Sequence, residues 1–238
     1  MGAKRSKRRY EQQRSNIINF QPHKHKQVQI LPRNKNQETY MLKLLDARKD
    51  IVFGIGPAGT GKTLLAVQVA IKNFKEGLFD KIVITRPAVS VDEDLGFLPG
   101  TMEDKMAPWT RPIFDVFKQY YHPKEISSML EDDIVEIAPL SYMRGRTFKK
   151  AFIVADEMQN ATQSQMKMLL TRIGERSQMA VTGDLHQADR MSNNGLLDFV
   201  KKLEGHRDET SHIDIVRFQH GDIERHKAVS EVLDIYGD

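Results

Sequence analysis

From residue 36 onward, short apolar runs rich in valine and isoleucine alternate with segments of helical periodicity. Strands separated by helices in this way are typical of βαβ units, which build a parallel sheet. The runs "KIVIT" and "AFIVA" are almost continuously apolar, which predicts strands that are buried on both faces. The pattern therefore predicts an α/β fold with a mostly parallel sheet. We expect strands at 51–55, 82–85, 134–138, 151–155, 179–182 and 213–218, and helices at 37–48, 62–76, 111–121, 162–173, 195–203 and 223–236.

A longer segment, residues 87–133, interrupts this alternation between the second and third strands and contains the only tryptophan, Trp109. We expect it to form an insertion, either a lid or a small helical element. The aromatic residues Trp109, Tyr120 and Tyr121 could stack on nucleic-acid bases. The helical spacing of neighbouring apolar residues favours a place in the core for them instead.

The composition is that of a folded protein with a sizeable core, since 39% of the 238 residues are hydrophobic. The chain has no cysteine, which excludes a disulfide scaffold, a cysteine-ligated zinc site and a thiol nucleophile. It also has no run of 18 apolar residues, so we expect no membrane span. A cytoplasmic location fits both observations.

The net charge of +4 conceals two regions of opposite charge. The first 35 residues carry ten basic side chains against Glu11 alone, a charge of +9, which leaves −5 for residues 36–238. We expect residues 1–35 to form a basic, flexible arm in front of a single acidic domain, residues 36–238. The arm could be a solvated tail or an arm that contacts nucleic acid, and the sequence leaves both open.

The strongest local motif is a glycine-rich loop. Residues 56–63 read GPAGTGKT and match G-x-x-x-x-G-K-[ST] in full, between a predicted strand and a predicted helix. The glycines let backbone N–H groups surround phosphate oxygens, while Lys62 neutralises the β- and γ-phosphates and Thr63 offers a hydroxyl to Mg²⁺. We therefore expect ATP and Mg²⁺ to bind here. The expected binding residues are Gly56, Pro57, Ala58, Gly59, Thr60, Gly61, Lys62 and Thr63.

Two acids, Asp156 and Glu157, follow the predicted strand 151–155. Ligands of parallel sheets bind at the carboxyl ends of the strands, where both carboxylates should lie. Asp156 is suited to hold Mg²⁺, and Glu157 could orient or deprotonate the water that attacks the γ-phosphate. The pair favours hydrolysis over phosphoryl transfer to a metabolite.

Further candidates follow from the chemistry of the γ-phosphate. Asp184 and Gln187, just past the next strand, could sense that phosphate or its water, and His186 is a weaker candidate. A guanidinium could stabilise the transition state, either from the same subunit or from a neighbour. The candidate arginines are Arg144, Arg146, Arg217 and Arg225.

Six segments in order, "GPAGTGKTLLAVQVA", "ITRPAV", "LGFLPG", "PLSYMRGRTF", "IVADEMQNAT" and "VTGDLHQ", resemble the PhoH family of P-loop ATPases. The resemblance implies a RecA-like three-layer αβα sandwich of the additional-strand class, related to the motor domains of superfamily 1 helicases. By position, Gln37 is similar to the adenine-contacting glutamine of such motors, and Arg225 is similar to the C-terminal arginine of the family.

The resemblance also implies a function: ATP hydrolysis coupled to binding or remodelling of RNA or single-stranded DNA. A full helicase of this type needs two RecA-like domains, and roughly 200 residues hold only one. We therefore expect either a homo-oligomer, such as a hexameric ring in which an arginine reaches the ATP of a neighbour, or a nucleotide-gated binding module that does not unwind.

Overall fold

A computed structural model of the chain describes residues 27–87, 102–185, 194–206 and 211–224, together with residues 228, 229, 232 and 235. In this part of the chain six strands form one sheet, and every pair of neighbours is parallel. The order in the sheet is β3-β2-β4-β5-β1-β6. The strands are β1 (Ile51–Ile55), β2 (Lys81–Thr85), β3 (Val135–Ile137), β4 (Ala151–Ala155), β5 (Gln178–Gly183) and β6 (Ile213–Arg217).

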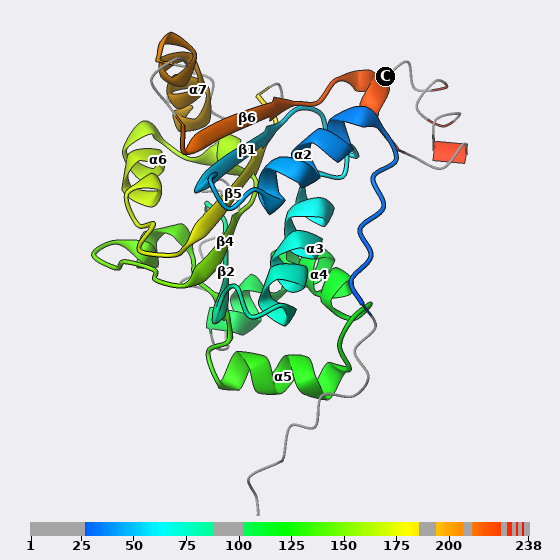
Figure 1. Cartoon of the computed structure of the whole chain (residues 1–238), viewed down its shortest axis with the longest axis vertical. Coiled ribbons are helices and arrows are strands. Elements are labelled where there is room, and N and C mark those ends of the chain that lie inside the picture. The colour runs from blue at the N-terminus through cyan, green and yellow to red at the C-terminus, as the bar shows by residue number, and fades with distance from the viewer. Residues whose placement is uncertain are drawn as a thin grey trace, which may run out of the picture.

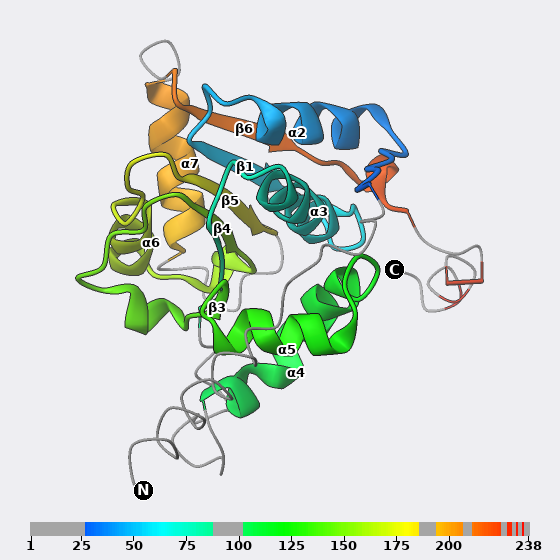
Figure 2. The same cartoon turned by 60° about the horizontal axis from the view of Figure 1, so that its bottom comes forward.

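Helices cover both faces of the sheet, as Figures 1 and 2 show. On one face the strands pack against α2, α3, α4 and α5, and on the other against α6 and α7. The helices are α2 (Lys35–Leu45), α3 (Lys62–Lys75), α4 (Met102–Phe117), α5 (Pro123–Glu131), α6 (Gln163–Leu170) and α7 (Gly195–Gly205), with 3-10 turns η1 (Leu140–Met143), η2 (Met158–Asn160) and η5 (His220–Asp222). None of the described helices is long and apolar enough to cross a bilayer.

Alternation along the central strands explains their continuous apolar sequences. In β1, Val52 belongs to the core under α2 and α3, whereas Ile51 and Phe53 belong to the core under α6 and α7. Every residue of β1 and β4 is buried. Because side chains of successive strand residues point to opposite faces, both faces need apolar residues. The predicted α/β fold with helices on both faces is confirmed.

The strand order determines where the functional loops meet. Strand β5 lies between β1 and β4, with Ile55 beside Gly183 and Ala155 beside Val181. This is the additional-strand arrangement that the resemblance implied. Since all strands are parallel, the loops after β1, β4 and β5 leave the sheet at the same edge.

The predicted helix 111–121 is longer than expected, and a helix after it was missed. Helix α4 begins at Met102, and α5 starts at Pro123 with His122 as its N-cap. The His122 side chain accepts a hydrogen bond from the helix backbone, and the Glu125 side chain accepts one from the His122 N–H. Histidine is an uncommon N-cap residue, so the signal for a helix start at this position is weak.

The described part of the insertion is helical and packs onto the body. Phe117 and Tyr121 are buried in the same core as α3, and their rings stack on each other. The predicted place of Tyr121 in the core is therefore confirmed, whereas Trp109 and Tyr120 are only partly buried. Residues 88–101 of the insertion lie outside the described residues.

The two ends of the chain are described only in part. Val28 is 7% exposed and belongs to the core, although it precedes the domain boundary expected at residue 36. Most of the expected basic arm, residues 1–26, lies outside the described residues. The same is true of most of the helix expected at 223–236. Ile223 and Glu224 are not helical, whereas the described residues 228, 229, 232 and 235 are.

The close approach of α7 to the loop before α6 gives a test of the fold. A Cβ on Gly195 would lie 2.3 Å from the Thr162 carbonyl oxygen, whereas one on Gly205 would meet nothing within 4 Å. We predict that Gly195→Ala destabilises the fold by about 1–3 kcal/mol, because backbone must move to admit the methyl group. Thermal unfolding of Gly205→Ala is the matched control, and equal melting temperatures for the two variants would contradict this packing.

Candidate nucleotide-binding site

The loop between β1 and α3 has a backbone that only glycine adopts easily. Gly59 and Gly61 both have φ of 81° and Gly56 has φ of 146°. A Cβ on Gly56 would also lie 2.4 Å from the carbonyl oxygen of Phe218. The glycines of the motif thus permit both the left-handed turns and the close approach of the neighbouring chain. The loop ends at Gly61, which directly precedes the first turn of α3.

The Lys62 amine lies inside this loop. Its Nζ donates hydrogen bonds to the carbonyl oxygens of Gly56 and Pro57, both at 2.6 Å. Burial lowers the pKa of the Lys62 amine, and three nearby carboxylates partly offset this effect. The acceptors are neutral carbonyls that can be exchanged for phosphate oxygens. Lys62 therefore lies where it can bind a phosphate held by this loop.

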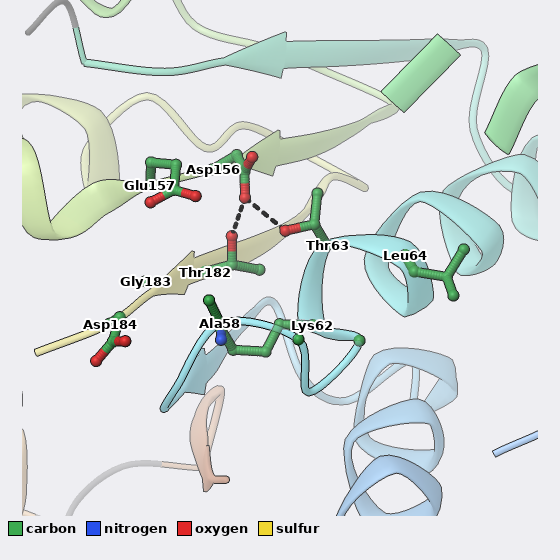
Figure 3. A pocket seen from close by; sticks show the side chains of 11 residues that line it. Ala58, Lys62, Thr63, Leu64, Asp156, Glu157, Thr182, Gly183 and Asp184 are labelled. Carbon is green, nitrogen blue, oxygen red and sulfur yellow. Dashed lines mark hydrogen bonds between the residues drawn. The ribbon is translucent and has the colours of Figure 1, made fainter. Parts of the chain in front are cut away.

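Asp156 forms the centre of the site. Its Oδ1 accepts hydrogen bonds from Thr63 Oγ1 at 2.7 Å and from Thr182 Oγ1 at 2.5 Å (Figure 3). Asp156 is 8% exposed, so its carboxylate needs these donors. A carboxylate beside a hydroxyl is the hard-oxygen pair that Mg²⁺ takes when nucleotide phosphates and water complete its shell. Thr182 was not among the sequence candidates, although it lies two residues before Asp184.

Among the described residues, no three His, Cys, Asp or Glu side chains are grouped so that they could hold a metal ion by themselves. Thr63 and Asp156, the two residues predicted to hold Mg²⁺, are the pair that the structure brings into contact.

Glu157 adopts a left-handed backbone conformation, with φ of 53° and ψ of 39°. Its carboxylate accepts a hydrogen bond of 2.5 Å from Gln159 Nε2. Gln159 Oε1 in turn accepts one of 3.1 Å from the Asp184 backbone N–H, and Gln159 is 2% exposed. This buried amide connects the ends of β4 and β5. Sequence reasoning missed Gln159, whose only signal was its place in "DEMQNAT".

Lys62, Thr63, Asp156 and Glu157 line one cavity of about 250 Å³ at the carboxyl edge of the sheet (Figure 3). The residues come from the loop after β1, the start of α3, and the ends of β4 and β5. The predicted site residues that line it are Ala58, Gly59, Gly61, Lys62, Thr63, Asp156, Glu157 and Asp184.

A second cavity of about 840 Å³ shares Gly59, Gly61 and Leu64 with the first. Gln37 lines it, as part of α2. The Gln37 amide donates to the Thr60 carbonyl oxygen at 3.1 Å and accepts from the Arg33 N–H at 2.8 Å. Gln37 thus supports the phosphate loop from behind, and its predicted contact with adenine stays a prediction.

The predicted arginines do not line the first cavity where they are described. Arg146 makes a bidentate pair with Glu136, and its guanidinium lies 4.5 Å from the centre of the Phe148 ring. Burial by itself would raise the pKa of the Glu136 carboxyl, but hydrogen bonds from Arg146 and Lys81 lower it. Arg146 is therefore anchored within its own subunit.

Of the other candidates, Arg144 is exposed and Arg217 pairs with Glu204. Gln187, His186 and Arg225 lie outside the described residues.

Comparison with known proteins places this geometry in a family. The sequence pattern described as "PhoH-like protein" matches residues 29–237. A PhoH-like protein of Mycobacterium bovis is 45% identical over 87% of this chain and 58% of its own length, and Protein PhoH of Escherichia coli K12 is 41% identical over 87% and 58%. The chain thus spans less than two thirds of these curated relatives.

Among solved structures, the large terminase of bacteriophage HK97 has the same fold. It superimposes with a TM-score of 0.55 over 88% of this chain and 48% of its own, at 12% sequence identity. The terminase supports the P-loop NTPase fold, in agreement with the sheet order and the phosphate loop. Together with the match over residues 29–237, these findings show that the chain belongs to the PhoH family.

Proposed function

We propose that this chain is a Mg²⁺-dependent ATP hydrolase whose nucleotide state controls its binding to single-stranded nucleic acid. One observation carries the hydrolase half of the proposal. The phosphate loop with Lys62, the Thr63–Asp156 pair and Glu157 all face one cavity. A P-loop with a metal-holding acid binds nucleoside triphosphates, and a second acid beside it provides for attack by water.

In the proposed mechanism the loop amides and Lys62 hold the β- and γ-phosphates. Thr63 and Asp156 would hold Mg²⁺, which when bound offsets the negative charge of those phosphates. Thr182 keeps the Asp156 carboxylate in place, because its hydroxyl donates to the same carboxylate oxygen as the Thr63 hydroxyl does. Because Asp156, Glu157 and Asp184 also line the cavity, Lys62 and a bound Mg²⁺ would together supply the positive charge that the triphosphate needs there.

Glu157 has the position of a residue that orients the attacking water or accepts its proton. Its carboxylate lines the cavity, and the left-handed backbone sets its direction. The hydrogen bond from Gln159 restricts the carboxylate to one orientation. Gln159 does not line the cavity, so we assign it as a positioning residue rather than a catalytic one.

No arginine among the described residues lines this cavity. A guanidinium would stabilise a transition state with charge on the γ-phosphate, and the predicted Arg225 lies outside the described residues. We keep the two arrangements expected from the sequence. Either subunits assemble, for example as a hexameric ring, and a neighbour supplies the arginine, or hydrolysis is slow and serves to reset a nucleotide-gated binding module.

The nucleic-acid half of the proposal rests on charge. The first 35 residues carry +9 and the remainder −5, so a polyanion is attracted to one end of the chain. Relatives in the family extend beyond this chain, and their full activities do not follow from the part that matches.

Loss of Lys62 or Glu157 should separate binding from hydrolysis. We predict that Lys62→Ala weakens ATP binding and turnover together, because the phosphates lose their cation. Glu157→Gln should keep ATP binding and lose about 100-fold or more in turnover, the range of a general base. A phosphate-release assay measures turnover, and a fluorescent ATP analogue measures binding. Lys201→Ala and Glu131→Gln, both exposed, are the controls, and wild-type turnover in either site variant would refute the assignment.

The role of Gln159 predicts a split between kinetic constants. Gln159→Ala removes the hydrogen bond that holds Glu157, so we expect kcat to fall about tenfold, the value of one hydrogen bond of roughly 1–1.5 kcal/mol. The KM for ATP should stay within about twofold, since Gln159 makes no contact with the cavity. Exposed Gln163→Ala is the matched control. A change in KM alone, with kcat unchanged, would count against a positioning role.

The basic arm can be tested by deletion of residues 2–14, which carry six basic side chains. We predict weaker binding to single-stranded RNA or DNA and a shallower dependence of affinity on salt, because fewer counterions are released. Fluorescence anisotropy over a series of KCl concentrations measures both. A salt slope equal to that of the full chain would show that the arm makes no phosphate contacts.

A further inference from the structure

A groove of about 760 Å³ lies between η1 and α6, apart from the nucleotide cavity. We call it the basic groove. Its walls include Ser141 and Arg144 on one side, and Ser164, Lys167 and Arg172 on or just after α6 on the other. Figure 1 shows α6 with α7 on the face of the sheet opposite α2 and α3. None of the lining residues belongs to the nucleotide site described above.

The charge of the basic groove is one-sided. Arg144, Lys167 and Arg172 line it, and no aspartate or glutamate does. None of the three is in a salt bridge within the described residues. By contrast, the neighbouring Arg146 is neutralised by Glu136. The groove therefore concentrates positive charge on a body whose total charge is negative.

Arg172 shows how one of these charges is held in place. Its guanidinium donates to the carbonyl oxygens of Met168 at 3.1 Å and Arg146 at 3.0 Å, and to Thr171 Oγ1 at 3.0 Å. These partners are neutral, so they fix the side chain without cancelling its charge. A fixed cation adds to affinity for an anion with little further loss of side-chain entropy.

The remaining features suit a strand with unpaired bases. The hydroxyls of Ser141 and Ser164 can donate hydrogen bonds to phosphate oxygens, as serine does in many nucleic-acid complexes. Tyr142, next to Ser141 in η1, is 61% exposed. An exposed aromatic ring beside a positive groove can stack on a base, and only an unpaired base offers its face.

We propose that the basic groove binds the phosphate backbone of single-stranded nucleic acid, with a base stacked on Tyr142. This inference rests on the proposed function and names the surface that performs its nucleic-acid half. The charges lie on both walls of an open groove, which suits a strand that runs along it. The same surface assigns Arg144 to strand binding within its own subunit.

Helix α6, one wall of the basic groove, is connected by a short stretch of chain to the nucleotide site. Four residues, 158–161, separate Glu157 from Thr162, the N-cap of α6, and they include the turn η2. Thr162 and Gln165 form a capping box that fixes the start of the helix. The opposite wall is tied to the end of β2 by a hydrogen bond from the Leu140 N–H to the Arg86 carbonyl oxygen. The chain from Glu157 through η2 thus leads directly into the helix that forms one wall of the groove.

The decisive comparison is Lys167→Glu against Lys201→Glu. Both lysines are exposed on helices of the same layer, and Lys201 lies outside the basic groove. We expect Lys167→Glu to weaken binding of fluorescein-labelled oligo(U) and oligo(dT) by about tenfold or more. The slope of log affinity against log salt concentration should become shallower by about one. Lys201→Glu should bind within about twofold of wild type. Lys167→Gln, which removes the charge without reversing it, should show a smaller loss in the same direction.

Tyr142→Ala tests the stacking contact separately. We expect it to weaken binding of the single strands by about tenfold and to leave duplex binding unchanged, because duplex bases are already stacked. Equal losses for single strands and duplex would overturn the stacking role. Oligo(U) and oligo(dT) in parallel show whether RNA or DNA is preferred, and either result supports the groove.

Other outcomes distinguish this inference from the proposed function. If wild-type protein binds the strands and Lys167→Glu binds them equally well, the groove assignment is wrong and the proposed function stands. If wild-type protein hydrolyses ATP in a Lys62-dependent manner but binds neither strand, the groove and the nucleic-acid half both fail. If a polyglutamate peptide displaces the strands as efficiently as unlabelled oligo(U) does, the groove recognises acidic chains in general and the proposal is overturned.

Discussion

Asp156 connects the ends of three strands of the sheet. It follows β4, its carboxylate accepts a hydrogen bond from Thr182 near the end of β5, and it accepts another from Thr63 in the helix that follows β1. A carboxylate that is 8% exposed is stable only with such donors. The same contacts place it where a metal bound to Thr63 would also touch it. Folding and the proposed chemistry thus depend on one set of hydrogen bonds.

Much of this arrangement could be predicted from the sequence because its signals are local. Apolar runs identified all six described strands, and the phosphate motif together with the acids after "AFIVA" identified the centre of the site. Short runs such as "KIVIT" and "AFIVA", rich in valine and isoleucine, are typical of strands that are buried on both faces. The parallel sheet then brings the ends of β1, β4 and β5 to one edge without any further information.

What the sequence could not show depends on contacts between distant residues. Helix α5 begins at an uncommon histidine cap. The partner of Arg146 is Glu136, ten residues earlier in β3, so an arginine that looked available for catalysis is anchored. Gln159 has a role only because β4 and β5 are adjacent and Asp184 offers its N–H. Each of these follows from packing rather than from a motif.

One sheet carries three features: a cavity for phosphates at the carboxyl edge, a positioning amide next to it and a basic groove beside α6. We propose above all that the Thr63–Asp156 pair holds Mg²⁺ with ATP. The affinity for a fluorescent ATP analogue, measured with and without Mg²⁺ in wild type, Thr63→Ser and Thr63→Ala, tests this role. We expect Mg²⁺ to tighten binding in wild type and Thr63→Ser but not in Thr63→Ala, which lacks the hydroxyl. Equal tightening by Mg²⁺ in all three proteins would show that Thr63 does not hold the ion.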